Sequence, residues 1–105
     1  MEREMIIYPF ADGEVKVKAL FENGTAWLTM EQMCQLFGEN EVIIGGLLTS
    51  IYAEGELREV DAVKKSTTNY YSLDAALAVG FRVRSHKGQL FRVWAMNNIL
   101  MHIMK

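Results

Sequence analysis

The N-terminal part of the chain changes from a strand pattern to a helix start, and this order constrains the fold most. Residues 15–20 (Val-Lys-Val-Lys-Ala-Leu) alternate apolar and charged side chains, which is typical of a half-exposed strand. Asn23-Gly24 is a strong turn dipeptide, and residues 25–28 continue as a short strand. Thr29 follows directly, and Gln32 completes a capping box that satisfies two free amides at a helix start. The pattern predicts a small antiparallel sheet that leads into a helix.

Two helices with a short connection are predicted next. The first covers residues 29–37, with Gly38 as its natural stop. The second runs from about residue 40 to residue 53. It contains Gly45-Gly46, which weakens it by up to about 2 kcal/mol relative to alanines. This spacing is that of a helix-turn-helix pair.

The region after the second helix is mixed in pattern. Residues 57–72 favour an extended segment, whose basic middle at 64–69 forms either a wing or an ordinary polar loop. A third helix, capped by Ser72 or Asp74, is predicted to run to Val83.

A fourth helix is predicted from Gly88 or Gln89 to about Met104. Its expected inner stripe consists of Leu90, Val93, Trp94, Asn97, Leu100, Met101 and Met104. The predicted fold is therefore α+β: a small N-terminal antiparallel sheet, a helix-turn-helix-like pair, a wing and two C-terminal helices. We expect a single winged-helix-like domain over residues 1–105.

Composition excludes several classes of protein. Half of the residues are apolar, so a core without disulfides is expected, and the single cysteine, Cys34, suits a reducing cytoplasm and the core of its helix. No apolar run is long enough for a membrane span, and Met1-Glu2-Arg3-Glu4 does not resemble a secretory signal. The two histidines and the cysteine show no metal or nucleophile spacing, and no glycine-rich phosphate loop exists. We expect a cytoplasmic, non-enzymatic protein without a metal, cofactor, small-molecule substrate or membrane partner.

Charge is distributed unevenly along the chain. Residues 1–61 carry four basic and twelve acidic side chains, a net charge of −8, whereas residues 62–105 carry seven basic and one acidic, a net charge of +6. The acidic residues end at Asp74, so no nearby carboxylate in the sequence neutralises the basic cluster that follows. This asymmetry indicates a polyanion-binding face, although pairing between the two halves would explain it equally well.

Several strings in the chain resemble the RhuM-type virulence protein family. In sequence order they are Thr25-Ala26-Trp27-Leu28-Thr29-Met30-Glu31-Gln32-Met33, Leu36-Phe37, Glu54-Gly55-Glu56-Leu57, Tyr71-Ser72-Leu73-Asp74, Val79-Gly80-Phe81-Arg82-Val83, Ser85-His86, Gln89 and Phe91-Arg92-Val93-Trp94-Ala95. The C-terminal portion also resembles the Bro-N class of phage and viral regulatory domains.

The resemblance implies a virulence-associated, DNA-binding regulatory module of bacterial or phage origin that forms the N-terminal domain of a longer protein. Its partner would be double-stranded DNA, bound in transcription regulation. One departure concerns the second helix, where Glu39 and Glu41 would repel phosphate and residues 42–44 offer few base contacts. The resemblance therefore predicts DNA binding, whereas the residues of the second helix do not favour contact with DNA.

The predicted DNA contacts come from the two basic stretches. We expect phosphate contact from Arg84 and Lys87 more than from Arg92, whose stem is suited to covering apolar neighbours. Phe91 and Trp94, spaced as neighbours on one helix face, are assigned to the core. The full predicted DNA-binding set is Lys64, Lys65, Thr67, Asn69, Arg84, His86, Lys87 and Arg92.

A second hypothesis is a protein-interaction or dimerisation module that no longer binds DNA. The second helix carries more apolar residues than one core face requires, and a homodimer would bury the surplus. The predicted dimerisation residues are Ile43, Ile44, Leu47 and Leu48.

Overall fold

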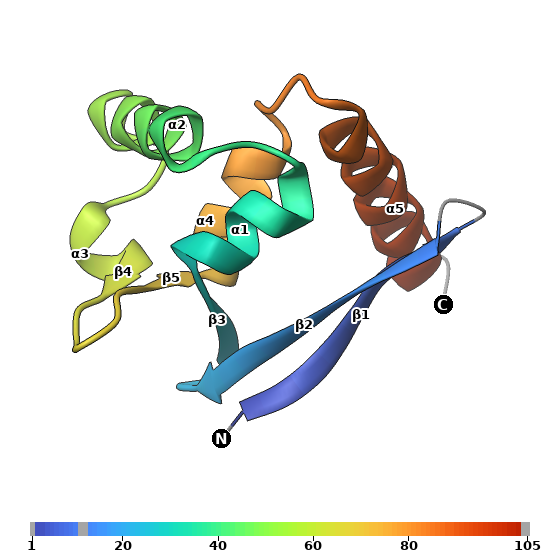
Figure 1. Ribbon diagram of the computed structural model, residues 1–105, viewed down its shortest axis with the longest axis horizontal. Coiled ribbons are helices and arrows are strands. Elements are labelled where there is room, and N and C mark those ends of the chain that lie inside the picture. The colour runs from blue at the N-terminus through green and yellow to red at the C-terminus, as the bar shows by residue number, and fades with distance from the viewer. Residues whose placement is uncertain (1, 11–12, 104–105) are drawn as a thin grey trace.

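The computed structural model describes residues 2–10 and 13–103, and the side chains of Glu2 and of residues 17–97. Within this part, the chain forms one five-stranded antiparallel sheet and five helices (Figure 1). In chain order the elements are β1 (Glu2–Phe10), β2 (Gly13–Glu22), β3 (Thr25–Thr29), α1 (Met30–Phe37), α2 (Glu41–Ala53), α3 (Glu59–Ala62), β4 (Val63–Lys64), β5 (Tyr70–Ser72), α4 (Leu73–Gly80) and α5 (His86–Ile103).

The sheet has the order β1-β2-β3-β5-β4. Strands β2 and β3 are joined at Asn23 and Gly24, whose φ angles of 53° and 77° are those of a tight hairpin turn. The two long strands β1 and β2 form a ribbon that extends beneath α5, and α5 contacts β1 (Figure 1). The predicted N-terminal antiparallel sheet is confirmed.

Helix α1 begins with the predicted capping box. The Thr29 hydroxyl accepts a hydrogen bond from the Gln32 amide at 3.1 Å, and the Gln32 side chain accepts from the Thr29 amide at 2.9 Å. Gln32 also donates to the Lys18 carbonyl of β2 at 2.7 Å, which fixes the helix against the sheet. The helix ends at Gly38, whose φ of 64° lies in the left-handed region.

The predicted starts of α2 and α4 are confirmed, and of the two alternatives for the cap of α4, Ser72 and Asp74, the structure selects Ser72. The Asn40 side chain accepts from the Ile43 amide at 3.0 Å, and the Ser72 hydroxyl accepts from the Ala75 amide at 3.1 Å. Helix α4 ends at Gly80, three residues earlier than predicted. Just after it, the Arg82 amide donates to the Val79 carbonyl only three residues back, which is a tighter turn than that of an α-helix.

Helix α5 begins earlier than predicted, at His86. The Ser85 hydroxyl accepts a hydrogen bond from the Gly88 amide at 3.0 Å, which makes Ser85 the capping residue. The signal was present in the sequence, because a serine immediately before a helical segment is a common helix start.

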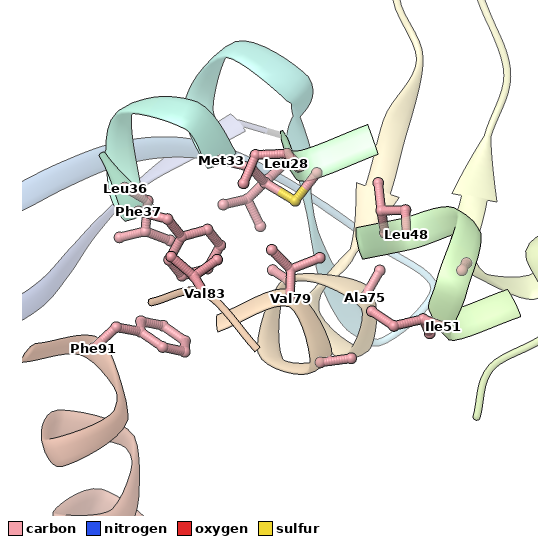
Figure 2. Close-up of a cluster of buried hydrophobic side chains, with 14 of the residues drawn as sticks. Leu28, Met33, Leu36, Phe37, Leu48, Ile51, Ala75, Val79, Val83 and Phe91 are labelled. Carbon is pink, nitrogen blue, oxygen red and sulfur yellow. The ribbon is translucent and has the colours of Figure 1, made fainter. Parts of the chain in front are cut away.

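The core lies between α1, α2 and α4, with α5 closing one side (Figure 2). Its largest fully buried side chains are Phe37, Phe91, Leu28, Met33, Leu36, Ile44, Ile51, Val79 and Val83. Phe91 of α5 packs edge-on against Phe37 of α1, with 5.0 Å between ring centroids. A Cβ atom at Gly80 would contact the Phe91 ring and lie 3.0 Å from Phe37, so only glycine allows α4 this approach.

The predicted inner stripe of α5 is wrong at Val93 and at Asn97, which are both exposed. Phe91 and Ala95 are the buried positions, whereas the Val93 side chain is 49% exposed. The Phe91 ring sets the rotation of the helix, because it fills the space above Gly80 and against Phe37. Leu100, Met101 and Met104 lie outside the residues whose side chains are described.

The segment from 57 to 72 forms a hairpin at the sheet edge. Val63 of β4 pairs with Tyr71 of β5, and β5 in turn pairs with β3. The short helix α3, which precedes the hairpin, was not predicted. Together, the sheet, the α1–α2 pair, the hairpin and the two C-terminal helices confirm the predicted α+β fold.

Candidate nucleic-acid interface

The turn between α4 and α5 carries three exposed basic side chains of the predicted site. Arg84, His86 and Lys87 are exposed, and the latter two form the first turn of the 18-residue helix α5. Within the described residues, the Arg84 guanidinium forms no hydrogen bond or ion pair. The amino end of a helix favours anions because its first amides point outward without helical partners. The turn can therefore bind an anion both through the free backbone amides at the start of α5 and through its basic side chains.

The same turn is fixed to the carboxyl end of α1. The Ser85 hydroxyl donates to the Phe37 carbonyl, and the Lys87 ammonium lies 3.5 Å from the Gln35 carbonyl. The Lys87 stem packs over Gly38, with its Cδ atom 3.1 Å from the position that a Cβ would take there. These contacts hold the cationic turn rigidly on the core.

Arg82 is neutralised by the acidic end of α2. Its guanidinium donates to both oxygens of Glu54, at 2.9 and 3.1 Å, and to Glu56 at 2.8 Å. Hydrogen bonds and the positive charge of Arg82 lower the pKa of Glu54 below its ordinary value, and the two carboxylates raise the pKa of Arg82. No carboxylate close to Arg82 in the sequence neutralises it, but folding brings the end of α2 to it. At Arg82 the structure therefore shows the pairing between the two halves that the charge pattern left open.

Arg92 has a structural contact that competes with DNA. Its half-buried guanidinium donates to the Gly80 carbonyl at 3.1 Å and to the Val83 carbonyl. These carbonyls belong to the carboxyl end of α4 and the residues just after it, where helical carbonyls lack partners. Arg92 therefore joins α5 to α4 through its Nη1 atom, which donates to both carbonyls.

The hairpin contains one engaged lysine and one exposed lysine. Lys64 forms an ion pair with Glu22 and lies 6.0 Å from the centre of the Trp27 ring. Lys65, Thr67 and Asn69 are exposed. Lys64 joins the edge strand β4 to β2 through this ion pair. The DNA contacts predicted for the hairpin are therefore reduced to Lys65, Thr67 and Asn69.

Helix α2 lies between the two cationic regions, with the hairpin and the α4–α5 turn on different sides of it (Figure 1). Gly45, Thr49 and Tyr52 line a hollow beside the hairpin, while Ile43 and Leu47 line a groove beside Arg84. The predicted DNA-binding residues are thus not gathered into one patch. They flank α2, whose exposed side chains include the apolar Val42 and Ile43 as well as the polar Glu41, Thr49 and Ser50.

The predicted dimerisation residues fall on two faces of α2. Ile44 and Leu48 are 0% and 3% exposed and belong to the core, so they are not available to a partner. Ile43 is 45% exposed, Leu47 is half-buried, and the neighbouring Val42 is 83% exposed. The prediction is corrected to Ile43 and Leu47, because α2 uses its other face to pack on α4.

Two further features bear on chemistry. Cys34 is half-buried against the core, and burial, with Glu41 and Glu31, raises the pKa of its thiol. In the part of the chain that the structure describes, no three histidine, cysteine or acidic side chains meet as a metal site. None of the helices described there is long and apolar enough to cross a membrane.

The fold and these contacts define a small α+β domain with cationic segments on two sides of an apolar helix. The chain belongs to the virulence protein RhuM family, whose family model matches residues 50–105. The matched range covers the end of α2, the hairpin, α4 and α5, whereas the similar strings at residues 25–37 lie outside it. Comparison with curated proteins and with solved structures gave no significant match.

Proposed function

We propose that the chain is a non-enzymatic DNA-binding module of a bacterial or phage regulator, and that it contacts the phosphate backbone. The observation that carries this proposal is the exposed guanidinium of Arg84, which has no protein partner in the described residues and lies at the amino end of α5. Arginine matches phosphate with two parallel donors, and a helix amino end adds backbone donors.

The neighbouring basic side chains support the same contact. Lys87 and His86 stand in the first turn of α5, and the contacts of Ser85 and Lys87 with α1 hold the turn in place. A turn whose backbone is held in place loses little backbone entropy when it binds, so each phosphate contact contributes more to affinity. The exposed Lys65, Thr67 and Asn69 of the hairpin supply a second contact on the other side of α2.

Helix α2 does not act as the reading helix in this proposal. Glu39 and Glu41 stand at its amino end, and its exposed side chains include Val42 and Ile43. Specific base contacts in the major groove require hydrogen-bond donors and acceptors, which these apolar side chains lack. We therefore expect backbone-dominated binding with weak sequence preference and strong salt dependence.

Replacing Arg84 with methionine is expected to reduce the salt dependence of duplex binding. Each phosphate contact contributes about 0.9 to the slope of log K against log salt, so the slope should fall by roughly one unit. The measurement is fluorescence anisotropy of a labelled duplex, titrated at several salt concentrations.

The matched control is Arg58→Met. Arg58 is also an exposed arginine, but it stands before α3 and pairs with Asp61 at 3.5 Å. This variant changes the net charge equally and should leave the slope unchanged. Equal slopes for the wild type and Arg84→Met would remove Arg84 from the interface, and no duplex binding at low salt would contradict the proposal.

The second candidate function is self-association through α2. It is favoured by the exposed Val42 and Ile43 and by Gly46, where an added Cβ would meet no atom within 4 Å. A second copy packed on this face would remove the apolar side chains from water.

Replacing Ile43 with glutamate is expected to convert such a dimer into a monomer, because a charge would be buried in an apolar interface. Sedimentation equilibrium gives the mass of each variant. Val60→Glu serves as the control, since Val60 is 72% exposed on α3, away from this face. A wild-type protein that sediments as a monomer would contradict this candidate.

A further inference from the structure

A hollow of about 290 Å³ lies between α2, α3 and the β4–β5 hairpin. Tyr52 of α2, Glu59 of α3, Lys65 of the hairpin loop and Tyr71 of β5 are among the residues that line it. In Figure 1 these elements surround one region at the left of the molecule. The volume is near the lower limit of small-molecule pockets, about 300 Å³, and therefore suits a small ligand.

The first indication of a ligand is the Tyr52 hydroxyl. Its oxygen is buried and has no hydrogen-bond partner among the described residues. Burial, and then the nearby Glu59 carboxylate and Tyr71, raise the pKa of Tyr52 to about 12, so the hydroxyl keeps its proton. A buried hydroxyl without a partner destabilises a protein, and a ligand acceptor would relieve this cost.

The second indication is a pair of opposite charges beside that hydroxyl. Glu59 and Lys65 both line the hollow, and neither forms an ion pair in the described part of the chain. Both side chains also line an adjoining hollow with Val60 and Val63, so they stand at its entrance. A carboxylate and an ammonium that face one space are complementary to a ligand with both charges.

The third indication is an apolar wall. Met30, Leu48 and Val63 line the hollow, and Gly45 contributes no side chain to its lining. An added Cβ at Gly45 would meet no atom within 4 Å. The wall therefore offers apolar contact and room for a short aliphatic group.

We propose that this hollow binds a free α-amino acid with an aliphatic side chain. The Glu59 carboxylate would accept from its ammonium group, the Lys65 ammonium and the Tyr52 hydroxyl would donate to its carboxylate, and its side chain would lie against Leu48 and Val63. This ligand site goes beyond the proposed DNA contact at the α4–α5 turn and does not depend on it. The two proposals share Lys65, which also belongs to the proposed hairpin contact.

The test is a titration of the ¹⁵N-labelled protein with L-leucine, followed by backbone amide chemical shifts. We expect saturable shifts centred on Gly45, Thr49 and Lys65 at concentrations up to about 20 mM, a range that reveals even weak ligands. Two analogues serve as controls for the charges: 4-methylpentanoate lacks the ammonium, and isopentylamine lacks the carboxylate. Both should bind much more weakly than leucine.

Three variants locate the site. Gly45→Leu fills the hollow and should abolish the shifts, whereas Gly46→Leu makes the same change on the exposed neighbour, outside the hollow, and should retain them. Both replacements remove a helical glycine, so their effects on helix propensity are matched. Tyr52→Phe removes only the hydroxyl and should weaken leucine binding by about tenfold, the effect of losing one hydrogen bond to a charged group.

Several results would overturn the proposal. These are no saturable shift with leucine, equal shifts with either single-charge analogue, or retained binding in Gly45→Leu. The titration contains no DNA, so its failure leaves the DNA-binding proposal standing, and the failure of duplex binding leaves the ligand site standing.

Discussion

Replacing Phe91 with alanine is expected to lower the free energy of unfolding by about 3–5 kcal/mol, the usual cost of removing a buried phenylalanine ring. Phe91 is 2% exposed, and its ring packs edge-on against Phe37, 5.0 Å away between centroids. The ring also fills the space above Gly80, which carries no side chain that could expand into the gap. Urea-induced unfolding followed by circular dichroism measures the change.

Val93 provides the matched control on the same helix. Its side chain is 49% exposed, so Val93→Ala should change the free energy of unfolding by no more than about 0.5 kcal/mol. The pair tests the rotation of α5 directly, because the hydrophobic pattern alone favours Val93 as an inner residue. Similar losses of stability in the two variants would contradict the observed orientation of the helix.

Replacing Arg92 with methionine is expected to lower the free energy of unfolding by about 1.5–3 kcal/mol, the range for hydrogen bonds to a charged group. The guanidinium donates to the Gly80 and Val83 carbonyls, and methionine keeps the apolar stem while it removes the donors. We expect no change in the salt dependence of duplex binding, because the half-buried guanidinium of Arg92 is held within the protein by two carbonyls.

Arg84→Met should show the opposite pattern. Arg84 is exposed and has no partner among the described residues, so its removal should leave the unfolding curve unchanged and reduce the salt dependence. Urea unfolding and duplex anisotropy on the same two variants separate an arginine that joins helices from one that meets phosphate. A reduced slope together with unchanged stability for Arg92→Met would reverse the two assignments.

The elements with local signals were predicted well. Thr29, Asn40 and Ser72 cap their helices as the sequence indicates, and Gly38 ends α1 with a φ of 64°. Each of these signals acts within a few residues, because a side chain satisfies the amide of a residue two or three positions away. The turn at Asn23-Gly24 has the same local origin.

The misplaced features depend on contacts between distant segments. The rotation of α5 follows from the packing of Phe91 on Phe37, which lies more than fifty positions earlier in the sequence. Helix α3 has no side-chain cap, and its four residues are too few to show a helical repeat of apolar side chains. Neither feature has a signal in its own neighbourhood.

The candidate site shows the same division. The basic composition of the α4–α5 turn is visible in the sequence, but which cations remain accessible is not. Arg82 meets Glu54 and Glu56 across 28 and 26 positions, and Lys64 meets Glu22 across 42. The burial of Ile44 and Leu48, in contrast to Ile43, likewise depends on where α4 packs.

By itself, the sequence determined the α+β class, most helix boundaries and the location of the basic segments, because caps, turns and periodicity act over short distances. Only the tertiary structure decided which arginines are occupied, which face of α2 is buried, and that Tyr52, Glu59 and Lys65 line one hollow. Those properties depend on contacts between segments that are distant in the sequence, and a local sequence pattern does not indicate such contacts.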